Sequence, residues 1–303
     1  MEEEMNVSAF FFEDGFDPTP STEWMKSYWQ HSITLSLAYA GAIVLGQRLM
    51  AGRRALELRR LLVGWNVFLA AFSIAGFCRM TPELLWCLRR RSFTYSVCDA
   101  SFARGITGFW TEMFAISKVL EFGDTAFLIL RRRPLSFLHW YHHSTVLVYT
   151  WHAYKDHTAA GRWFIWMNYT VHSVMYSYFA VRALGWRLPK WLAMSVTLLQ
   201  LSQMVMGVAV AVRSYAVKLG GGQCRQTLTN LYFSFAIYAT YFVLFAHFFY
   251  GAYFKRGNKY EPTKQLLHSH EPKTKQLLNN HHVPNGYHPR LVQNGAPPTK
   301  KEL

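Results

Sequence analysis

Residues 135–154 read LSFLHWYHHSTVLVYTWHAY, a stretch in which aromatic and aliphatic side chains predominate. About 20 apolar residues are the length that an α-helix needs to cross a bilayer. This stretch nevertheless carries His139, His142 and His143 in the pattern H-x-x-H-H. Residues three and four positions apart lie on one side of a helix, so we expect the three rings to face the same way. The stretch therefore predicts a membrane helix with a titratable face.

Apolar stretches of similar length recur through the chain. Of 303 residues, 51% are hydrophobic, and the mean hydropathy of only +0.02 averages these stretches with a polar C-terminal tail. The helices of a large soluble protein would need a polar face, which such near-continuous apolar runs lack. The sequence therefore predicts an all-α polytopic membrane protein. Its seven transmembrane helices are expected near residues 32–50, 61–78, 107–130, 135–154, 162–182, 191–215 and 228–254.

The formal net charge is +15, and the basic residues gather at the ends of the apolar runs. Lys and Arg are enriched in the cytosolic loops of membrane proteins, so this pattern argues for a membrane orientation and against a nucleic-acid partner. It predicts a lumenal N-terminal segment (1–31), a transmembrane catalytic domain (32–254) and a cytosolic, largely disordered tail (255–303). Charge alone leaves the basic cluster at 89–91 unexplained.

The acidic N-terminus has no cleavable signal peptide, so the first span is expected to act as its own insertion signal. Two short signals agree with the predicted orientation. Asn6 begins an N-x-S glycosylation site, which requires a lumenal position. The chain ends in KKEL, and the pair Lys300 and Lys301 resembles the dilysine retrieval signal of endoplasmic-reticulum membrane proteins. We therefore expect a multi-pass protein of that membrane.

Two of the four cysteines fall in connections that this orientation places in the lumen. Cys98 follows the second span and Cys224 follows the sixth. Because disulfides persist in oxidising compartments, a bridge between these two residues is expected. Free thiols are the alternative.

Ionisable and polar side chains inside membrane spans are costly and are functional candidates by default. Here they recur at helical spacing on four successive spans. Ion pairing between helices is the alternative role for the charged residues, and interhelical hydrogen bonding is the alternative for the glutamines. Besides the three histidines, the set contains Lys118, Glu121, Asp124, Thr125, Asn168, His172, Tyr176, Thr197, Gln200 and Gln203.

Two chemistries suit such a histidine cluster. Imidazoles bind iron or zinc, and membrane desaturases and hydroxylases use H-x-x-H-H boxes. Those enzymes need several boxes, whereas this chain has one, and no C-x-x-C zinc spacing occurs. The other chemistry is catalysis by imidazole itself, in which a neutral ring attacks a thioester. The sequence favours imidazole catalysis without metal or cofactor. A metal-dependent desaturase or hydroxylase and a seven-span transporter or receptor remain alternatives.

Four motifs in order make the chain resemble the fatty-acid elongases of the endoplasmic reticulum. They are K-x-x-E-x-x-D-T at 118–125, H-x-x-H-H at 139–143, N-x-x-x-H-x-x-M-Y-x-Y at 168–178 and T-x-x-Q-x-x-Q at 197–203. The resemblance covers roughly residues 28–260. It implies seven spans, six of them forming a barrel around an enclosed acyl tunnel. It also implies condensation of a long-chain acyl-CoA with malonyl-CoA to give a 3-ketoacyl-CoA, CO2 and CoA. The Trp-Tyr pair inside the box resembles the subgroup that acts on saturated and monounsaturated chains.

Roles for the site residues follow from this reaction. His142 is the expected nucleophile, His172 the acid–base or thioester-binding group, and His139 and His143 would orient rings and polarise carbonyls. The other polar residues are expected to support them. Basic residues at the cytosolic mouth are candidates for holding CoA phosphates: Arg131, Arg132, Arg133, Arg182, Arg187, Lys190, Lys255 and Arg256. The expected partners are the ketoacyl-CoA reductase, dehydratase and enoyl reductase of the elongation cycle, membrane lipid and another elongase subunit.

Overall fold

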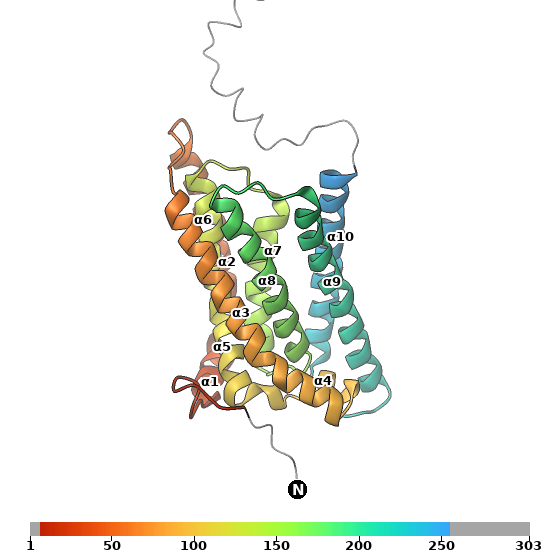
Figure 1. Ribbon diagram of the computed structural model, residues 1–303. Coiled ribbons are helices and arrows are strands. Elements are labelled where there is room, and N and C mark those ends of the chain that lie inside the picture. The colour runs from red at the N-terminus through yellow and green to blue at the C-terminus, as the bar shows by residue number, and fades with distance from the viewer. Residues whose placement is uncertain (1–6, 255–303) are drawn as a thin grey trace, which may run out of the picture. The chain divides into compact units, whose positions relative to one another are not determined.

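The computed structural model describes residues 7–254, and in that range every regular element is a helix. Helices α2, α3, α5 with α6, α7, α8, α9 and α10 run up and down alternately (Figure 1) and overlap the predicted spans. Their bounds are α1 Thr19–Tyr28, α2 His31–Met50, α3 Arg59–Arg90, α4 Phe93–Cys98, η1 Ser101–Ala103, α5 Gly105–Leu120, α6 Phe122–Leu130, α7 Phe137–Tyr154, α8 Gly161–Ala183, α9 Lys190–Leu219 and α10 Leu228–Tyr253.

Four of these helices, among the described residues, are long and apolar enough by composition to cross a membrane: α2, α3, α9 and α10. The chain is therefore a helical membrane protein. Helices α7 and α8, which carry the four candidate histidines with Asn168 and Tyr176, are not among these four.

The third predicted span is not one helix. It breaks at Glu121, so that α5 ends at Leu120 and α6 begins at Phe122. The next turn packs tightly, because a Cβ at Gly123 would lie 2.6 Å from the ring of Trp65 on α3. The break sets the direction of the side chains around Glu121.

The second predicted span is longer than expected, because α3 continues to Arg90. The prediction ended near residue 78, where charged residues begin. In the structure, Arg79 pairs with Glu13 of the N-terminal segment, and Glu83 pairs with the fully buried Arg162 of α8. Buried charges are tolerated when they are paired and hydrogen-bonded, so the helix continues through them.

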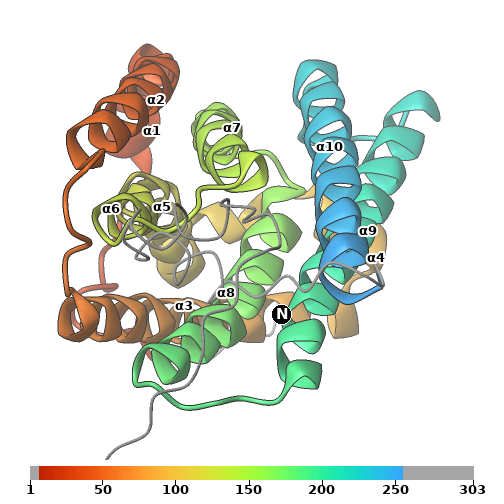
Figure 2. The same cartoon turned by 90° about the horizontal axis from the view of Figure 1, so that it is seen from above.

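Two helix pairs are packed closely at glycines. Gly76 of α3 leaves room for the ring of Tyr169 on α8, since a Cβ there would lie 2.5 Å from the ring. Gly207 of α9 does the same for Tyr238 of α10. Seen from above, α3 lies along α8, and α9 lies along α10 (Figure 2). Helices α2, α5, α6 and α7 form a third group.

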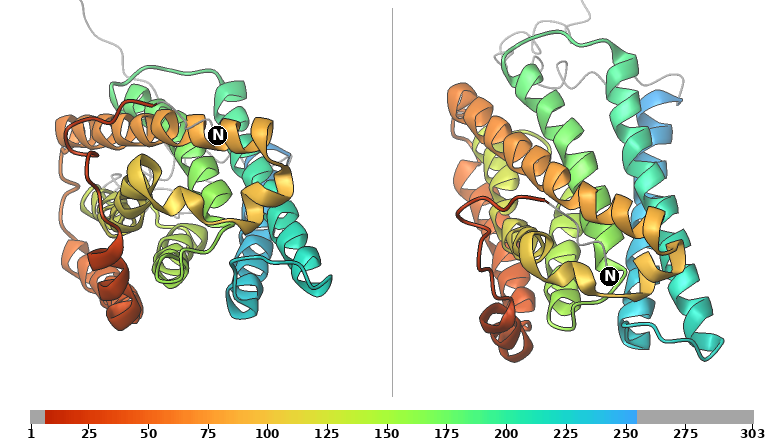
Figure 3. Two further views of the ribbon diagram at one scale, coloured as in Figure 1. Left: turned by 90° about the horizontal axis from the view of Figure 1, so that it is seen from below. Right: turned by 60° about the horizontal axis from the view of Figure 1, so that its bottom comes forward.

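The two ends of this helical unit differ. At one end, here called the histidine end, α6 and α8 finish and α7 and α9 begin (Figure 1). The opposite end, the disulfide end, holds α1, α4 and the connections that contain Cys98 and Cys224 (Figure 3).

Candidate functional site

The H-x-x-H-H motif occupies the first two turns of α7. The helix begins after Ser136, whose hydroxyl accepts a hydrogen bond from the backbone N–H of His139 at 3.2 Å, as expected of an N-cap serine. The rings of His139 and His143 lie 4.5 Å apart between centroids. The motif therefore lies just inside the histidine end.

The His142 ring departs from the expectation that all three rings share one side. It lies 5.4 Å from the His143 ring but 4.9 Å from the ring of Tyr241 on α10, and Phe245 is its next neighbour on that helix. Helical spacing places the Cβ atoms of the three histidines near each other, but contacts with α10 determine the orientation of the His142 ring. Its ring nitrogens make no hydrogen bond to any residue within 7–254.

A buried network connects α5 to α8. Lys118 Nζ lies 2.5 Å from Glu121 Oε1 and donates a hydrogen bond to Asn168 Oδ1 at 3.0 Å. The amide of Asn168 in turn has Nδ2 3.3 Å from His172 Nε2. All four side chains are buried.

These contacts indicate where the proton of His172 resides. Because Lys118 can only donate, it fixes the Asn168 oxygen on its own side and turns the amide nitrogen toward the ring. The ring nitrogen Nε2 must then accept, which leaves the proton on Nδ1. That nitrogen lies 3.6 Å from Glu121 Oε1. The network thus selects one tautomer of a buried histidine.

His143 and Glu121 approach each other without a hydrogen bond. Nδ1 of His143 lies 4.0 Å from Oε2 of Glu121. Both atoms are buried, and neither has a hydrogen-bond partner among the described residues. Buried polar atoms without a partner are rare in proteins, so both atoms are candidates for contact with a bound group.

Asp124 and Thr125 anchor the turn after the helix break. Asp124 accepts hydrogen bonds from Trp65 Nε1 at 2.6 Å and from the Tyr176 hydroxyl at 2.8 Å. Thr125 Oγ1 lies 2.9 Å from His139 Nε2 and 2.6 Å from the hydroxyl of Tyr39. Tyr176 therefore donates to Asp124, and His139 is held through Thr125.

The polar residues of α9 lie farther from the histidines. Gln200 Nε2 contacts the sulfur of Met175 on α8 at 3.4 Å. Gln203 and Thr197 are buried, and the Thr197 hydroxyl donates to the carbonyl of Ala193 in its own helix.

Sequence reasoning did not single out Tyr39, Trp65 or Tyr241 as partners of the site, since a lone Tyr or Trp in an apolar span carries no pattern. His152, a further histidine of α7, is buried with Nδ1 3.2 Å from the Asn230 amide. Within 7–254, no three His, Cys, Asp or Glu side chains converge as a group that could hold a metal ion.

The basic candidates that are described gather at the histidine end (Figure 1). Arg131–Arg133 follow α6, Arg182 ends α8, and Arg187 and Lys190 precede or begin α9. All are exposed except Arg131, which is half-buried. Arg132 donates to the carbonyl of Arg53 at 2.7 Å. Lys255 and Arg256 lie outside the described residues.

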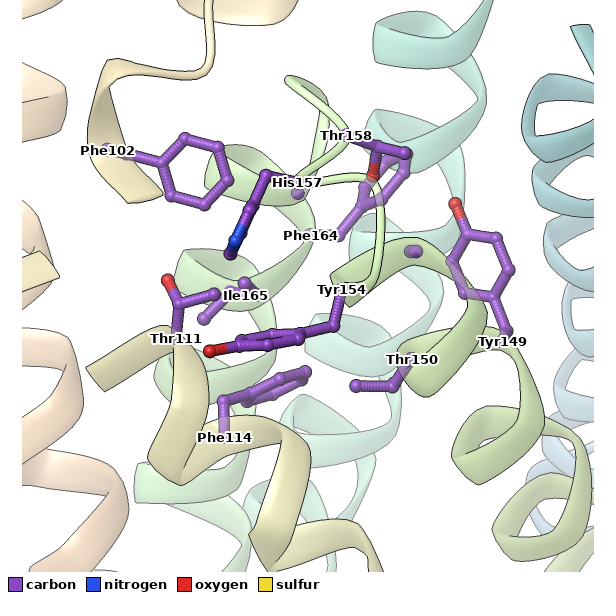
Figure 4. A pocket seen from close by; sticks show the side chains of 12 residues that line it. Phe102, Thr111, Phe114, Tyr149, Thr150, Tyr154, His157, Thr158, Phe164 and Ile165 are labelled. Atoms are coloured by element: carbon purple, nitrogen blue, oxygen red, sulfur yellow. The ribbon is translucent and has the colours of Figure 1, made fainter. Parts of the chain in front are cut away.

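An apolar cavity lies toward the disulfide end, where η1 and the connection between α7 and α8 form part of its wall. Figure 4 shows the side chains that line it. The space between its lining side chains, including space open to solvent, is about 410 Å³. Phe114 lines the cavity. Its ring also contacts Lys118, whose Nζ lies 4.1 Å from the ring centre. The cavity therefore adjoins the Lys118 network. Its other walls come from η1, α5, α7 and α8 and the connections between them: Phe102, Thr111, Tyr149, Thr150, Ala153, Tyr154, His157, Thr158, Gly161, Phe164 and Ile165.

A disulfide joins Cys98 to Cys224 at the disulfide end. Beside it, the backbone N–H of Arg225 donates to the Cys98 carbonyl at 2.9 Å. Cys78 and Cys87 are free. The glycosylation candidate Asn6 and the dilysine pair Lys300 and Lys301 lie outside the described residues.

The fold and the site define a helical membrane protein that encloses a histidine cluster beside an apolar cavity. Comparison with known sequences gives the family: the chain belongs to the ELO (GNS1/SUR4) family, whose pattern matches residues 24–261. The resemblance drawn from the four motifs is thereby confirmed.

Three relatives illustrate the similarity. The chain is 56% identical over 263 residues, covering 86% of this chain and 82% of the relative, to putative fatty acid elongase 3 of Caenorhabditis elegans. It is 43% identical over 256 residues, covering 84% of this chain and 96% of the relative, to very long chain fatty acid elongase 6 of Gallus gallus. The corresponding protein of Homo sapiens is 43% identical over 258 residues, with the same coverage of 84% and 96%.

Proposed function

We propose that this protein is the condensing enzyme of long-chain fatty-acid elongation, which joins a long-chain acyl-CoA to malonyl-CoA. The products are a 3-ketoacyl-CoA two carbons longer, CO2 and free CoA. The observation that carries the proposal is the juxtaposition of His142 and His143 with a buried, hydrogen-bonded network and an adjoining apolar cavity. The names of the relatives support it.

In the first step, a ring nitrogen of His142 attacks the thioester carbonyl of the acyl-CoA. The C–S bond breaks, CoA leaves as the thiolate and takes up a proton, and the acyl group remains on the imidazole. The rings of His142 and His143 make no hydrogen bond within 7–254, unlike the Nε2 atoms of His139 and His172. Because His143 faces Glu121, His142 is assigned as the nucleophile.

In the second step, malonyl-CoA loses CO2, and the electron pair of the broken C–C bond becomes an enolate. The enolate carbon attacks the acyl carbonyl, and the C–N bond to His142 breaks to release the 3-ketoacyl-CoA. The imidazolate left on His142 takes up a proton, which regenerates the neutral ring. Donors aimed at the developing negative charge stabilise such a step. His143, His139 and His172 are the candidates, with His172 held in one tautomer by Asn168.

The remaining polar residues hold these rings in place. Lys118 and Glu121 fix Asn168 and face His172 and His143. Asp124, with its donors Trp65 and Tyr176, anchors the turn that carries Thr125. Gln200 and Gln203 are assigned to the wall of the substrate passage.

The CoA part is assigned to the basic histidine end, with Arg131–Arg133, Arg182, Arg187 and Lys190 as the phosphate-binding set. Lys255 and Arg256 extend that set. This end then faces the cytosol, and the disulfide end faces the lumen of the endoplasmic reticulum. The arrangement has seven spans, six of them forming a barrel around the acyl tunnel, with Asn6 glycosylated and Lys300–Lys301 as retrieval signal. The reductases and the dehydratase of the cycle would act on the product.

The test uses full-length protein in lipid nanodiscs, treated with chelator and supplied with palmitoyl-CoA and 13C-labelled malonyl-CoA. Mass spectrometry should show labelled 3-ketoacyl-CoA from the wild type and from H247A, which removes an exposed histidine of α10, and none from H142A. A wild-type protein that forms product only after iron is restored contradicts the proposal.

A further inference from the structure

Helix α1 lies against the far end of the apolar cavity. Ser21 Oγ is 2.7 Å from the hydroxyl of Tyr154, and Thr22 Oγ1 is 2.6 Å from Nε2 of His157. Both Tyr154 and His157 line the cavity (Figure 4). One turn later, Met25 is buried in a cluster with Leu147, Ala115, Trp151 and Tyr154. Helix α1 thus touches the cavity wall at two hydrogen bonds and one apolar contact.

Tyr154 is held from two helices. Besides its contact with Ser21 on α1, its hydroxyl lies 3.3 Å from Glu112 Oε2 on α5. In Figure 4 its ring lies between Phe114 on one side and Phe102 and His157 on the other. Because its hydroxyl contacts two separate helices, the Tyr154 ring is held in one rotamer. A tyrosine without these hydroxyl contacts would change rotamer.

His157 separates the cavity from a second recess of opposite character. That recess has an empty volume of about 680 Å³ and shares His157 with the apolar cavity. Its other lining residues are polar or charged: Thr22, Lys26, Lys155, Asp156, Arg225, Gln226 and Thr227. The His157 side chain therefore separates the apolar cavity from the polar recess at the disulfide end.

The hydrogen bonds around Thr22 define the state of this wall. The Thr22 hydroxyl donates to the carbonyl of Pro18 at 2.6 Å, so it must accept from Nε2 of His157. Burial, with smaller contributions from the charges of Arg225 and Lys26, lowers the pKa of His157 to about 4. His157 is therefore neutral at physiological pH, as a wall beside hydrocarbon requires.

We infer that α1 is a latch that closes the acyl cavity through Ser21–Tyr154 and Thr22–His157, and so sets the longest acyl chain that the enzyme accepts. The inference rests on the proposed function, because it needs an acyl group carried at the histidine cluster. Tyr154 follows His142, the proposed acyl carrier, by 12 residues on α7, about 18 Å along the helix axis. An acyl chain that runs along the helix from His142 therefore meets Tyr154 after about 18 Å.

Changes at the latch and in the cavity should shift the length limit in opposite directions. S21A and Y154F each remove one side of the Ser21–Tyr154 bond and keep the volumes similar. Without it, Tyr154 can move aside, and turnover of acyl-CoAs longer than the wild-type limit should rise about fivefold to tenfold relative to shorter ones. A153L places added carbons in the cavity and should lower turnover of the longest accepted acyl-CoA about tenfold relative to the shortest.

The experiment measures condensation by the full-length protein in nanodiscs across saturated acyl-CoAs of increasing length. S27A is the matched control, since Ser27 is exposed on the same helix and makes no hydrogen bond within 7–254. S21T keeps a hydroxyl at position 21 and should retain the wild-type length limit. An increase with S21A and Y154F together with a decrease with A153L supports the latch.

Variants that lose activity equally at every chain length, or that keep the wild-type limit, overturn the latch and leave the proposed condensation intact. A wild-type protein that condenses no acyl-CoA of any length overturns both.

Discussion

Lys118 and Glu121 face each other across one helical turn in the interior of the protein, with Nζ 2.5 Å from Oε1 and both side chains buried. Because Lys118 also fixes the Asn168 amide, this pair joins the α5–α6 break to the histidines. The geometry of α5 at this pair therefore affects the chemistry of the histidines.

The first prediction concerns the cost of breaking this pair. K118M and E121Q each leave one partner buried without its counterpart, and the loss is expected to be about 3–5 kcal/mol of stability. The double variant K118M/E121L removes both charges and should unfold closer to the wild type, although it should not condense acyl-CoA. Thermal unfolding in detergent checks this. A double variant less stable than both single ones would show that the charges do not act as a pair.

The second prediction concerns the tautomer of His172. N168L removes the amide that donates to Nε2 and should reduce kcat by about fivefold to thirtyfold, as expected for about 1–2 kcal/mol of lost hydrogen bonding. KM for acyl-CoA should change little. T170V is the control, since the Thr170 hydroxyl bonds only the carbonyl of Trp166 in its own helix. An unchanged kcat in N168L would mean that Asn168 does not set the state of the ring.

The third prediction concerns pH and the N-terminal segment. Burial opposes ionisation of Glu13, but hydrogen bonds from Arg79, the Phe10 amide and Trp110 outweigh it and hold the pKa of Glu13 below its ordinary 4.5. A depressed carboxyl pKa contributes stability above the ordinary value, and that stability is lost as pH falls through the folded-state pKa.

E13Q should therefore lower Tm by several degrees at pH 7, with the difference from wild type shrinking below about pH 4.5. The check is a thermal unfolding series from neutral to acidic pH. A constant difference across that series would show that the charge of Glu13 is not what anchors the segment.

The fourth prediction concerns the disulfide end. Cys98 and Cys224 are 126 residues apart, and a bridge closing so long a loop typically contributes about 2–4 kcal/mol. C98A/C224A should therefore unfold at lower temperature, whereas C78S, which removes a free exposed thiol, should not. Thiol labelling under denaturing conditions should count two reactive cysteines in the wild type and four after reduction. Four before reduction would contradict the bridge.

Much of the helix layout could be predicted because apolar runs of membrane length are a local property of the chain. The errors arise where partners are distant. The second span was predicted too short because Arg79 and Glu83 look like a membrane boundary, and only Glu13 and Arg162 reveal that they are paired. Helix α1 was missed because only Thr22 and Met25 on it are buried, too few to give an apolar face.

The candidate residues were identified by spacing, but not their directions. His139 and His143 adjoin as helical periodicity requires. The His142 ring turns toward Tyr241, a residue of α10 nearly 100 positions away that no pattern on α7 could indicate. The Asn168 amide likewise owes its orientation to Lys118 on another helix.

A half-reaction with acyl-CoA alone decides whether an imidazole carries the acyl group. Purified protein is mixed with acyl-CoA in the absence of malonyl-CoA, and free CoA is measured against protein, followed by mass spectrometry of the peptide containing residues 137–154. We expect a burst of about one CoA per chain and an acyl mass on His142, with both absent in H142A. CoA release only after malonyl-CoA is added, with no acyl adduct, would contradict it.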